Sequence, residues 1–370
     1  MAKFIVHIGD GKCGSSSIQS ALFDSREKLL NLGFSYASHH RTSGNFCFGT
    51  LLGKNTRGSI RQQRGFALQV IEQLKRQLDQ SEYIIISSEA FLTMEPEEVV
   101  EILQFITLDI ERIDVIAYVR DPLGMYLSMA QQLLKASYRF PSPDTYVRAL
   151  DRMLNNWETY PMINSVTVRL FDRNSLIGEN SVSDFSYVLK KLTGFDLPLE
   201  KVNENSSLSA EQMVVLQHYR SRFHSQSDGK MAPESSRIVE LFGMMNSEGL
   251  VGSKPVLSPP VAAAIAFTNA GIVERLNSRY SFAIHCPRPL PEDLPPADAN
   301  WSLISSILTE VKSSYVHNLK MLLPAFNPAL NSGDMDKGLH AMNKLVEMEP
   351  DKKLAIERAT KNYWTTESIA

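Results

Sequence analysis

The clue to the fold is the stretch FIVHIGDGKCGSSS, which runs from Phe4 to Ser17. Its first five residues form a short apolar run rich in β-branched side chains, which is typical of a buried strand. Three glycines then interrupt the pattern. From Ser16 onward, apolar side chains recur at helical spacing until Gly33 supplies a stop. The sequence therefore predicts a strand, a glycine-rich turn and a helix in direct succession.

The same alternation of strand and helix patterns continues along the chain. Short apolar runs predict further strands at residues 82–88, 114–119 and 166–170. Helical patterns occur at residues 59–79, from Pro96, from Pro122, at 182–192, from Ser209 and at 262–280. Such alternation predicts an α/β fold, in which helices cover both faces of a central parallel sheet.

Changes in composition suggest a division into three parts. Residues 1–286 carry the strand and helix alternation and form the expected α/β domain. Residues 287–300 are rich in proline and are expected to be a connector. Residues 301–370 have helical patterns at 301–324 and 335–362, which predict a helical C-terminal extension.

Composition and charge narrow the class of protein. Hydrophobic residues make up 43% and charged residues 21%, close to ordinary globular usage. A formal charge of −3 argues against broad binding of nucleic acids or anionic membranes. The chain has three cysteines without metal-binding spacing, no apolar region of signal-peptide length and no run long enough to span a membrane. We therefore expect a cytoplasmic protein without a membrane span, while its oligomeric state stays open.

The glycine-rich turn has the composition of a phosphate-binding site. Glycines allow backbone N–H groups to approach a phosphate, and the helix start adds further N–H groups at its positive dipole end. Serine hydroxyls add donors, and Lys12 adds a positive charge. The candidate residues are Gly11, Lys12, Cys13, Gly14, Ser15, Ser16 and Ser17. The spacing differs from that of a Walker A loop. A tight turn with a solvated lysine and a serine cap is the alternative interpretation.

A second polar element follows the strand expected at 114–119. Arg120 ends that strand, and Ser128 lies eight residues later, off the apolar stripe of the next helix. Ligands of open α/β sheets bind beyond the carboxyl ends of the strands, so Arg120 lies beside the glycine-rich turn if the two strands are neighbours. An arginine fork and a hydroxyl in one crevice suit a second phosphate. The alternative is an Arg120 paired with a carboxylate and a Ser128 on a solvated face.

Together, the two elements resemble the sulfotransferases that use 3′-phosphoadenosine-5′-phosphosulfate (PAPS). That family has a Lys-x-Gly-Ser/Thr-Ser/Thr turn after its first strand, matched here by Lys12-Cys-Gly-Ser-Ser16. It also has a strand ending in Arg-Asp-Pro with a serine eight residues past the arginine, matched by Arg120-Asp-Pro122 and Ser128. Smaller likenesses occur at Ile86-Ser-Ser-Glu89, Arg169-Leu-Phe171 and Asn205-Ser-Ser-Leu-Ser209. The resemblance covers residues 3–280, is closest to bacterial and carbohydrate-directed members, and implies a P-loop-NTPase-like three-layer domain.

The resemblance also implies roles for these residues. The turn from Gly11 to Ser17 would hold the 5′-phosphosulfate of PAPS, with Lys12 beside the transferred group. Arg120 and Ser128 would hold the 3′-phosphate, and the product would be 3′,5′-bisphosphoadenosine. The sulfonate carries one negative charge, so no metal ion is required. The acceptor would be a hydroxyl or amine of a small molecule, carbohydrate or lipid, with a carbohydrate or glycolipid expected.

A general base should remove the proton of the acceptor, and Glu89 is the first candidate. It follows the apolar run Ile84–Ile86, so it should project into the same crevice. Related carbohydrate sulfotransferases place a glutamate near this point. The alternative is that Glu89 caps the next turn or pairs with Arg120 or Lys12. His39 and His40 are rival bases, because other family members use histidine.

Two other functions compete with this interpretation. A P-loop kinase of a small molecule would need a magnesium site, which usually includes an acidic residue at the end of a neighbouring strand. A module that binds a phosphorylated ligand without catalysis would need only the phosphate-binding turn. The joint presence of Lys12, Arg120, Ser128 and a plausible base favours the transferase.

Overall fold

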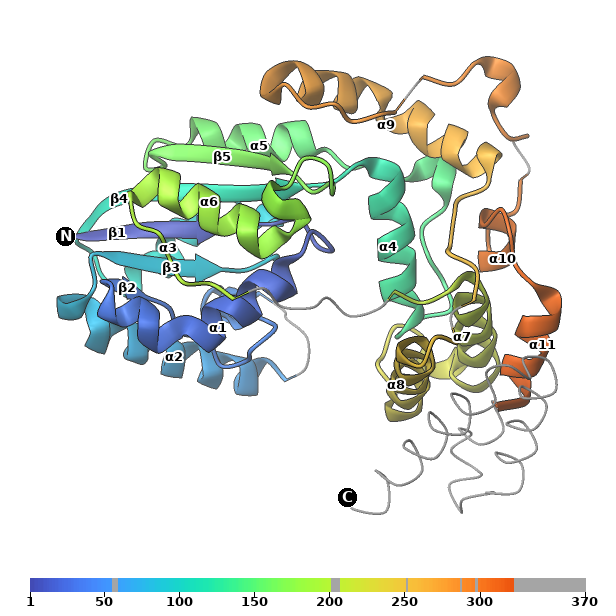
Figure 1. Cartoon of the computed structure of the whole chain (residues 1–370), viewed down its shortest axis with the longest axis horizontal. Coiled ribbons are helices and arrows are strands. Elements are labelled where there is room, and N and C mark those ends of the chain that lie inside the picture. The colour runs from blue at the N-terminus through green and yellow to red at the C-terminus, as the bar shows by residue number, and fades with distance from the viewer. Residues whose placement is uncertain (55–58, 201–206, 251, 287, 297–298, 323–370) are drawn as a thin grey trace, which may run out of the picture. The chain divides into compact units, whose positions relative to one another are not determined.

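The computed structural model describes residues 1–54, 59–200, 207–250, 252–286, 288–296 and 299–322, which divide into two compact units (Figure 1). Unit 1 comprises Met1–Asp121, Arg148–Glu204 and Gly271–His285, and unit 2 comprises Pro122–Val147, Asn205–Ala270 and Cys286–Ala370. Parts of the predicted 1–286 domain therefore belong to unit 2. The predicted boundaries at 286 and 300 stay predictions, and the helix predicted at 335–362 lies outside the described residues.

Unit 1 contains a sheet of five parallel strands in the order β2-β3-β1-β4-β5. The strands are β1 (Ala2–His7), β2 (Phe34–Ser35), β3 (Tyr83–Ser87), β4 (Ile110–Val119) and β5 (Ser165–Leu170). The prediction of an α/β fold with a parallel sheet between helices is confirmed. Of the five strands in this sheet, only the short edge strand β2 was not predicted.

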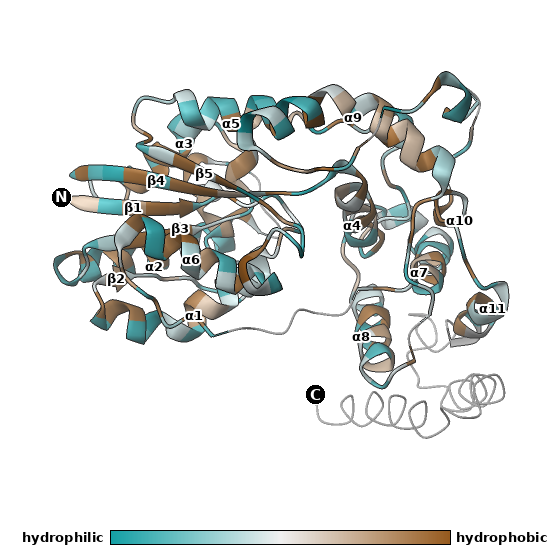
Figure 2. Ribbon diagram, turned by 45° about the horizontal axis from the view of Figure 1, so that its top comes forward, coloured by the Kyte–Doolittle hydropathy of each residue, from teal (hydrophilic) through white to brown (hydrophobic). Residues whose placement is uncertain are grey.

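Helices cover both faces of this sheet, which explains why its central strands are continuously apolar. Figure 2 shows α1 and α6 on one side of the sheet, and α3 and α5 on the other. The side chains of Phe4, Ile5 and Val6 in β1 are fully buried. The helices of unit 1 are α1 (Ser15–Asn31), α2 (Ile60–Gln77), α3 (Pro96–Gln104), α5 (Leu150–Thr159) and α6 (Ser181–Thr193).

The strand order brings the candidate segments to one edge of the sheet. β1 pairs in parallel with both β3 and β4, and His7 at its end lies opposite Ser87 and Ile116. The segments that leave β1, β3 and β4 therefore begin at the same carboxyl edge. Arg120 was predicted to lie beside the glycine-rich turn only if β1 and β4 are neighbours, and the structure shows that they are.

Unit 2 is helical in the part that the structure describes. The helix α7 contacts α4, α8, α10 and α11. Ser209 and Gln212 form the predicted capping box at the start of α7. The fully buried Arg220 of α7 donates to the carbonyl oxygens of Ala136 and Lys230, which ties three segments together. The helices are α4 (Pro122–Leu134), α7 (Ala210–Phe223), α8 (Pro233–Ser247), α10 (Ile304–Ile307) and α11 (Ser313–Leu322).

The long helix α9 (Pro259–Tyr280) begins in unit 2 and ends in unit 1. Within unit 1, its last residues are tied to α5, because Arg275 Nε lies 2.6 Å from Asp151 Oδ2 and the Tyr280 hydroxyl donates to Glu158 Oε1 at 2.7 Å. None of the helices in the described part of the chain has the length and apolar character that crossing a membrane requires.

Candidate functional site

The glycine-rich turn is anchored to β4 at its beginning and to α1 at its end. The N–H groups of Ile8 and Asp10 donate to the carbonyl oxygens of Ile116 and Tyr118, at 2.9 and 2.8 Å. Lys12 adopts a left-handed conformation with φ of 68°, which few residues other than glycine adopt. Its side chain is exposed. The backbone of the turn is therefore held in a defined and locally strained shape.

Gly14 ends the turn at a position where there is no room for a side chain. It has φ of 75° and is the N-cap residue of α1. A Cβ atom added here would lie 2.7 Å from Cβ and Oγ of Ser181 and 2.8 Å from Cε2 of Phe171. Such distances are far below van der Waals contact, so the position requires glycine. The turn thereby packs directly against the start of α6 and the segment after β5.

The three serines that follow Gly14 do not share one environment. Ser15 and Ser17 are buried, and Ser16 is exposed. The N–H groups of Ser17 and Ile18 both reach the carbonyl oxygen of Gly14, at 3.1 and 3.2 Å. Of the three serines, only Ser16 is therefore exposed to solvent, and the backbone N–H of Ser17 is already engaged within the turn.

Cys13 faces the interior rather than solvent. Its side chain is fully buried, and burial raises the pKa of the thiol well above its ordinary value. The thiol is therefore protonated at neutral pH and is not a nucleophile. The sequence placed Cys13 among the ligand-binding residues, and its side chain is buried away from that surface, so only its backbone can contribute.

Arg120 reaches the turn from the end of β4. Its Nη1 donates to the carbonyl oxygen of Lys12 at 3.5 Å, and its guanidinium carbon lies 5.8 Å from the centre of the Phe171 ring. Its Nε lies 3.8 Å from a carboxylate oxygen of Asp121. The side chain keeps 29% of its surface exposed, so the guanidinium can still meet a ligand. Ser128 lies on α4 in unit 2, and its pairing with Arg120 stays a prediction.

A buried ion pair beneath the turn was missed by the sequence analysis. Arg148 Nη2 lies 2.5 Å from Oδ1 of Asp10, whose side chain is only 5% exposed. The second carboxylate oxygen of Asp10 is buried without a hydrogen-bond partner among the described residues. Burial raises the pKa of the Asp10 carboxyl, and the charge of Glu89 adds to this rise, while Arg148 opposes it. Asp10 stands within the turn motif, but its partner is 138 residues away, so no local pattern indicates the pair.

His7 supports the turn from below as a neutral side chain. Its Nδ1 lies 2.8 Å from the Ser87 hydroxyl, and burial lowers its pKa to about 3. A Cβ added to Gly9 would lie 2.8 Å from His7 Nε2, so the backbone of the turn passes directly over the imidazole. His7 is therefore a structural residue, as its place inside a strand indicates.

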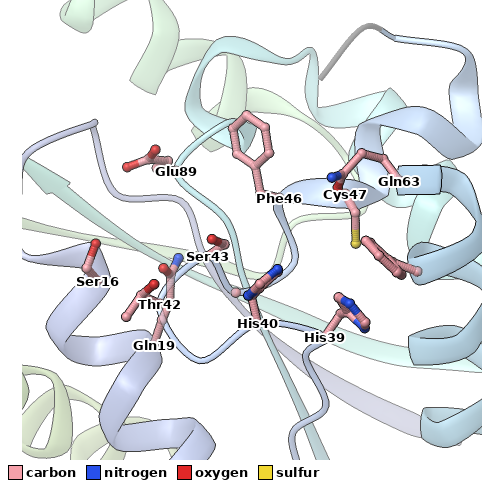
Figure 3. Close-up of a pocket in the computed structure, with 12 residues that line it drawn as sticks. Ser16, Gln19, His39, His40, Thr42, Ser43, Phe46, Cys47, Gln63 and Glu89 are labelled. Atoms are coloured by element: carbon pink, nitrogen blue, oxygen red, sulfur yellow. The ribbon is translucent and has the colours of Figure 1, made fainter. Parts of the chain in front are cut away.

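A cavity of about 310 Å³ opens beside the turn, entirely within unit 1 (Figure 3). Its lining comes from the start of α1, the loop before α2, α2 itself and the end of β3. The lining residues are Ser16, Gln19, His39, His40, Thr42, Ser43, Gly44, Phe46, Cys47, Gln63, Phe66 and Glu89. The structure thus brings the exposed serine of the turn and all three candidate bases to one cavity.

The three candidate bases differ in where they line the cavity. Figure 3 shows Ser16 at one end and His39 at the other, with His40 between them and Glu89 on the side of Ser16. The ring of His39 stacks on Phe66, with centroids 3.5 Å apart. Burial lowers the pKa of His39, and the neighbouring His40 lowers it further. Glu89 is therefore better placed than His39 to act next to a group held at the turn.

The loop that carries the two histidines is fastened to β3 by Asn45. This fully buried residue donates from Nδ2 to the carbonyl oxygen of Ala37 at 2.9 Å and accepts from the N–H of Ser87 at 2.9 Å. Its own N–H donates to the Ser87 carbonyl oxygen at 2.7 Å. A Cβ at Gly44 would lie 2.3 Å from that same oxygen, so the loop lies in close contact with the strand.

Three observations test whether the turn suits a nucleotide phosphate. Gly14 adds no side chain of its own to the turn, and the first turn of α1 contains no acidic residue. The buried Ser15 hydroxyl has no hydrogen-bond partner among the described residues. First-turn N–H groups lack partners inside a helix and favour an anion. The residues present therefore fit a phosphate group.

The fold and the site define an α/β protein with a glycine-rich, phosphate-compatible turn at the carboxyl edge of a parallel sheet. Comparison with protein-family models, with curated proteins and with solved structures found no match to this chain. Within the described residues there is no group of three or more His, Cys, Asp or Glu side chains that could hold a metal ion.

Proposed function

We propose that the protein transfers a sulfuryl group from PAPS to a hydroxyl or amine of an acceptor, with a carbohydrate or glycolipid as the expected class. The observation that carries this proposal is the contact between the Arg120 guanidinium and the carbonyl oxygen of Lys12. A glycine-rich turn alone would suit many phosphates. A turn joined by an arginine from the neighbouring strand suits a ligand with a second anionic group, as PAPS has.

Each part of the turn has a role in this proposal. The backbone from Gly11 to Ser17 would hold the 5′-phosphate, with the Ser16 hydroxyl as a further donor. Lys12 would stabilise the negative charge that develops on the leaving phosphate oxygen. Arg120 would hold the 3′-phosphate, and the sequence predicts Ser128 as a second contact to that phosphate. The Asp10–Arg148 pair would keep the turn in shape from below.

The chemistry needs a base and an in-line approach of the acceptor. PAPS supplies the sulfuryl group, whose bond to the 5′-phosphate oxygen breaks as the bond to the acceptor oxygen forms. Glu89 would take the acceptor proton, because it lines the cavity on the side of Ser16. His40, which also lines the cavity, is the alternative candidate for the base. Positioning and charge stabilisation would supply most of the rate enhancement, as in phosphoryl transfer.

The first test is calorimetric titration with 3′,5′-bisphosphoadenosine, AMP and ATP. We expect the bisphosphate to bind much more tightly than AMP to the wild type, because only the bisphosphate carries the 3′-phosphate. Arg120→Ala should remove that preference, since one charge-assisted contact contributes roughly 1.5–3 kcal/mol. The exposed Arg76 on α2 provides a matched control, and Arg76→Ala should bind like the wild type.

The alternatives predict different outcomes of the same titration. If ATP binds more tightly than the bisphosphate, and only when magnesium is present, the result would favour a P-loop kinase of a small molecule over the proposed sulfotransferase. A bisphosphate preference without turnover of any acceptor would favour the binding module. Equal affinity for the bisphosphate and AMP would refute the two-phosphate site itself.

A further inference from the structure

The imidazole of His7 is fixed in the core of unit 1 by two aromatic rings and a hydroxyl. Its ring makes an edge contact with Tyr118 of β4, with centroids 5.7 Å apart at an interplanar angle of 82°. It makes a tilted contact with Phe185 of α6, with centroids 5.3 Å apart. Its Nδ1 lies 2.8 Å from the hydroxyl of Ser87, the last residue of β3. The packing therefore sets the orientation of the ring and the direction in which each nitrogen faces.

The contacts of Ser87 determine which nitrogen carries the proton. Burial lowers the pKa of His7 to about 3, so the imidazole is neutral at pH 7 and has one N–H group. In the described part of the chain, the fully buried Ser87 hydroxyl contacts His7 Nδ1 and Gln19 Nε2, the latter at 3.3 Å. Because an amide nitrogen only donates, the hydroxyl hydrogen is directed to Nδ1; otherwise it would be buried without an acceptor. The imidazole proton therefore lies on Nε2.

The Nε2–H group faces the glycine-rich turn beside the Ser15 hydroxyl. A Cβ added to Gly9 would lie 2.8 Å from Nε2 and 3.1 Å from Ser15 Oγ, so both atoms border the same small space. Both are buried without a hydrogen-bond partner among the described residues. An unpaired buried donor and acceptor cost free energy, which a bond between them would recover. Rotation about the Cα–Cβ bond of Ser15 moves its Oγ within this space without moving the backbone.

We infer that His7 is a positioning residue for the phosphate that the turn binds, because its Nε2–H group donates to the Ser15 hydroxyl when the phosphate is bound. This bond would hold Ser15, whose N–H group belongs to the first turn of α1 and favours an anion. The hydrogen bonds would then link two turns of α1 through the sheet, by way of Gln19, Ser87, His7 and Ser15. The inference rests on the proposed function for the identity of the ligand.

The first experiment isolates the contribution of the 5′-phosphate. 3′,5′-Bisphosphoadenosine and adenosine 3′-phosphate differ only in that group, so the ratio of their dissociation constants, measured by calorimetry on the full chain, gives a 5′-phosphate factor. We expect Ser15→Ala and His7→Asn each to lower this factor about two- to tenfold, since each removes one neutral hydrogen bond. The asparagine amide reaches only as far as Nδ1. His7→Gln should restore most of the factor, because its amide nitrogen is as many bonds from the backbone as Nε2.

A double variant tests whether His7 acts through Ser15. His7→Asn combined with Ser15→Ala should lower the 5′-phosphate factor no further than either change alone, because both remove the same bond. Ser20 is also buried on α1, and Ser20→Ala is the control that should leave the factor unchanged. Additive losses in the double variant would overturn the inference. Equal losses of affinity for both nucleotides in His7→Asn would also overturn it, because they would show a general loss of structure.

Nitrogen-15 NMR of the imidazole gives a readout that a merely structural role would not move. The proton should lie on Nε2, and the bisphosphate should shift the Nε2 resonance in the wild type but not in Ser15→Ala. A proton on Nδ1 would overturn the inference, because Nε2 would then have no hydrogen to donate.

The inference and the proposed function can fail separately. Equal affinity of the wild type for the bisphosphate and AMP would refute the two-phosphate site, and AMP against adenosine would then give the 5′-phosphate factor. If no nucleotide binds, the proposed function is refuted, and inorganic pyrophosphate becomes the probe for the same variants. Weaker pyrophosphate binding in His7→Asn than in His7→Gln would support the role of His7. Absence of pyrophosphate binding to the wild type at millimolar concentrations would overturn it.

Discussion

Replacing Gly14 with alanine is the sharpest test of the turn, because two separate penalties act at that residue. Its φ of 75° is a left-handed conformation, and an added Cβ would lie 2.7 Å from the Cβ of Ser181 and 2.8 Å from Cε2 of Phe171. The left-handed conformation costs roughly 1–2 kcal/mol for a residue with a Cβ. Overpacking of the buried contact adds roughly 1–3 kcal/mol. We therefore expect Gly14→Ala to lower the free energy of unfolding by about 2–5 kcal/mol.

Gly11 provides the matched control within the same turn. No atom lies within 4 Å of a Cβ added there, and Gly11 is not among the glycines with positive φ. Gly11→Ala should therefore leave the free energy of unfolding within about 0.5 kcal/mol of the wild type. Urea unfolding without ligand, followed by circular dichroism, measures both variants. If Gly14→Ala also unfolded within about 0.5 kcal/mol of the wild type, the close packing of the turn against α6 would be refuted.

Three further predictions concern pH, a buried ion pair and catalysis. The pKa of His7 falls from 6.5 to about 3 on folding, so the unfolded chain binds a proton that the folded chain does not. The free energy of unfolding should therefore fall by up to about 1.4 kcal/mol per pH unit as the pH drops from 6.5 towards 3. In His7→Gln, the difference in this free energy between pH 7 and pH 5, measured by urea titration, should be smaller than in the wild type. Asp184 is fully buried and accepts from Arg169 Nε at 2.9 Å, so Asp184→Asn should cost about 3–5 kcal/mol. The exposed pair of Asp196 with Lys190 is the control, and Asp196→Asn should cost no more than about 1 kcal/mol by thermal or urea unfolding. Lys12→Ala should reduce turnover with PAPS far more than affinity for 3′,5′-bisphosphoadenosine, and equal losses would argue against a role in the transition state.

The sequence predicts the sheet well, because its buried strands are short, continuous apolar runs, which are typical of strands covered on both faces. β4 nevertheless begins at Ile110, four residues before the predicted start, because Glu111 and Arg112 interrupt the apolar pattern by which the strand was recognised. The edge strand β2 has only two residues, too few for any periodic pattern. Two helices, α5 and α8, were overlooked although a signal exists. In α5, Leu150, Leu154 and Trp157 recur at helical spacing and are buried.

The candidate site is less accessible to sequence reasoning than the sheet. The motif places Ser15, Ser16 and Ser17 in the turn, but only the rotation of α1 decides that Ser16 faces outward. The contact of Arg120 with the turn follows from strand order, which the sequence can suggest but not fix. The Asp10–Arg148 pair joins segments that are distant in the chain, so it becomes visible only when the chain is folded.

The anchoring of the histidine loop by Asn45 has a consequence for engineering. Because the buried amide fastens both Ala37 and Ser87, residues 39–43 are displayed on a frame whose ends are fixed by β3. Side chains on such a frame can be exchanged in combinatorial libraries without rebuilding the backbone beneath them. Randomising His39, His40, Thr42 and Ser43 while Gly44 and Asn45 are kept would therefore sample new ligand preferences on a stable scaffold.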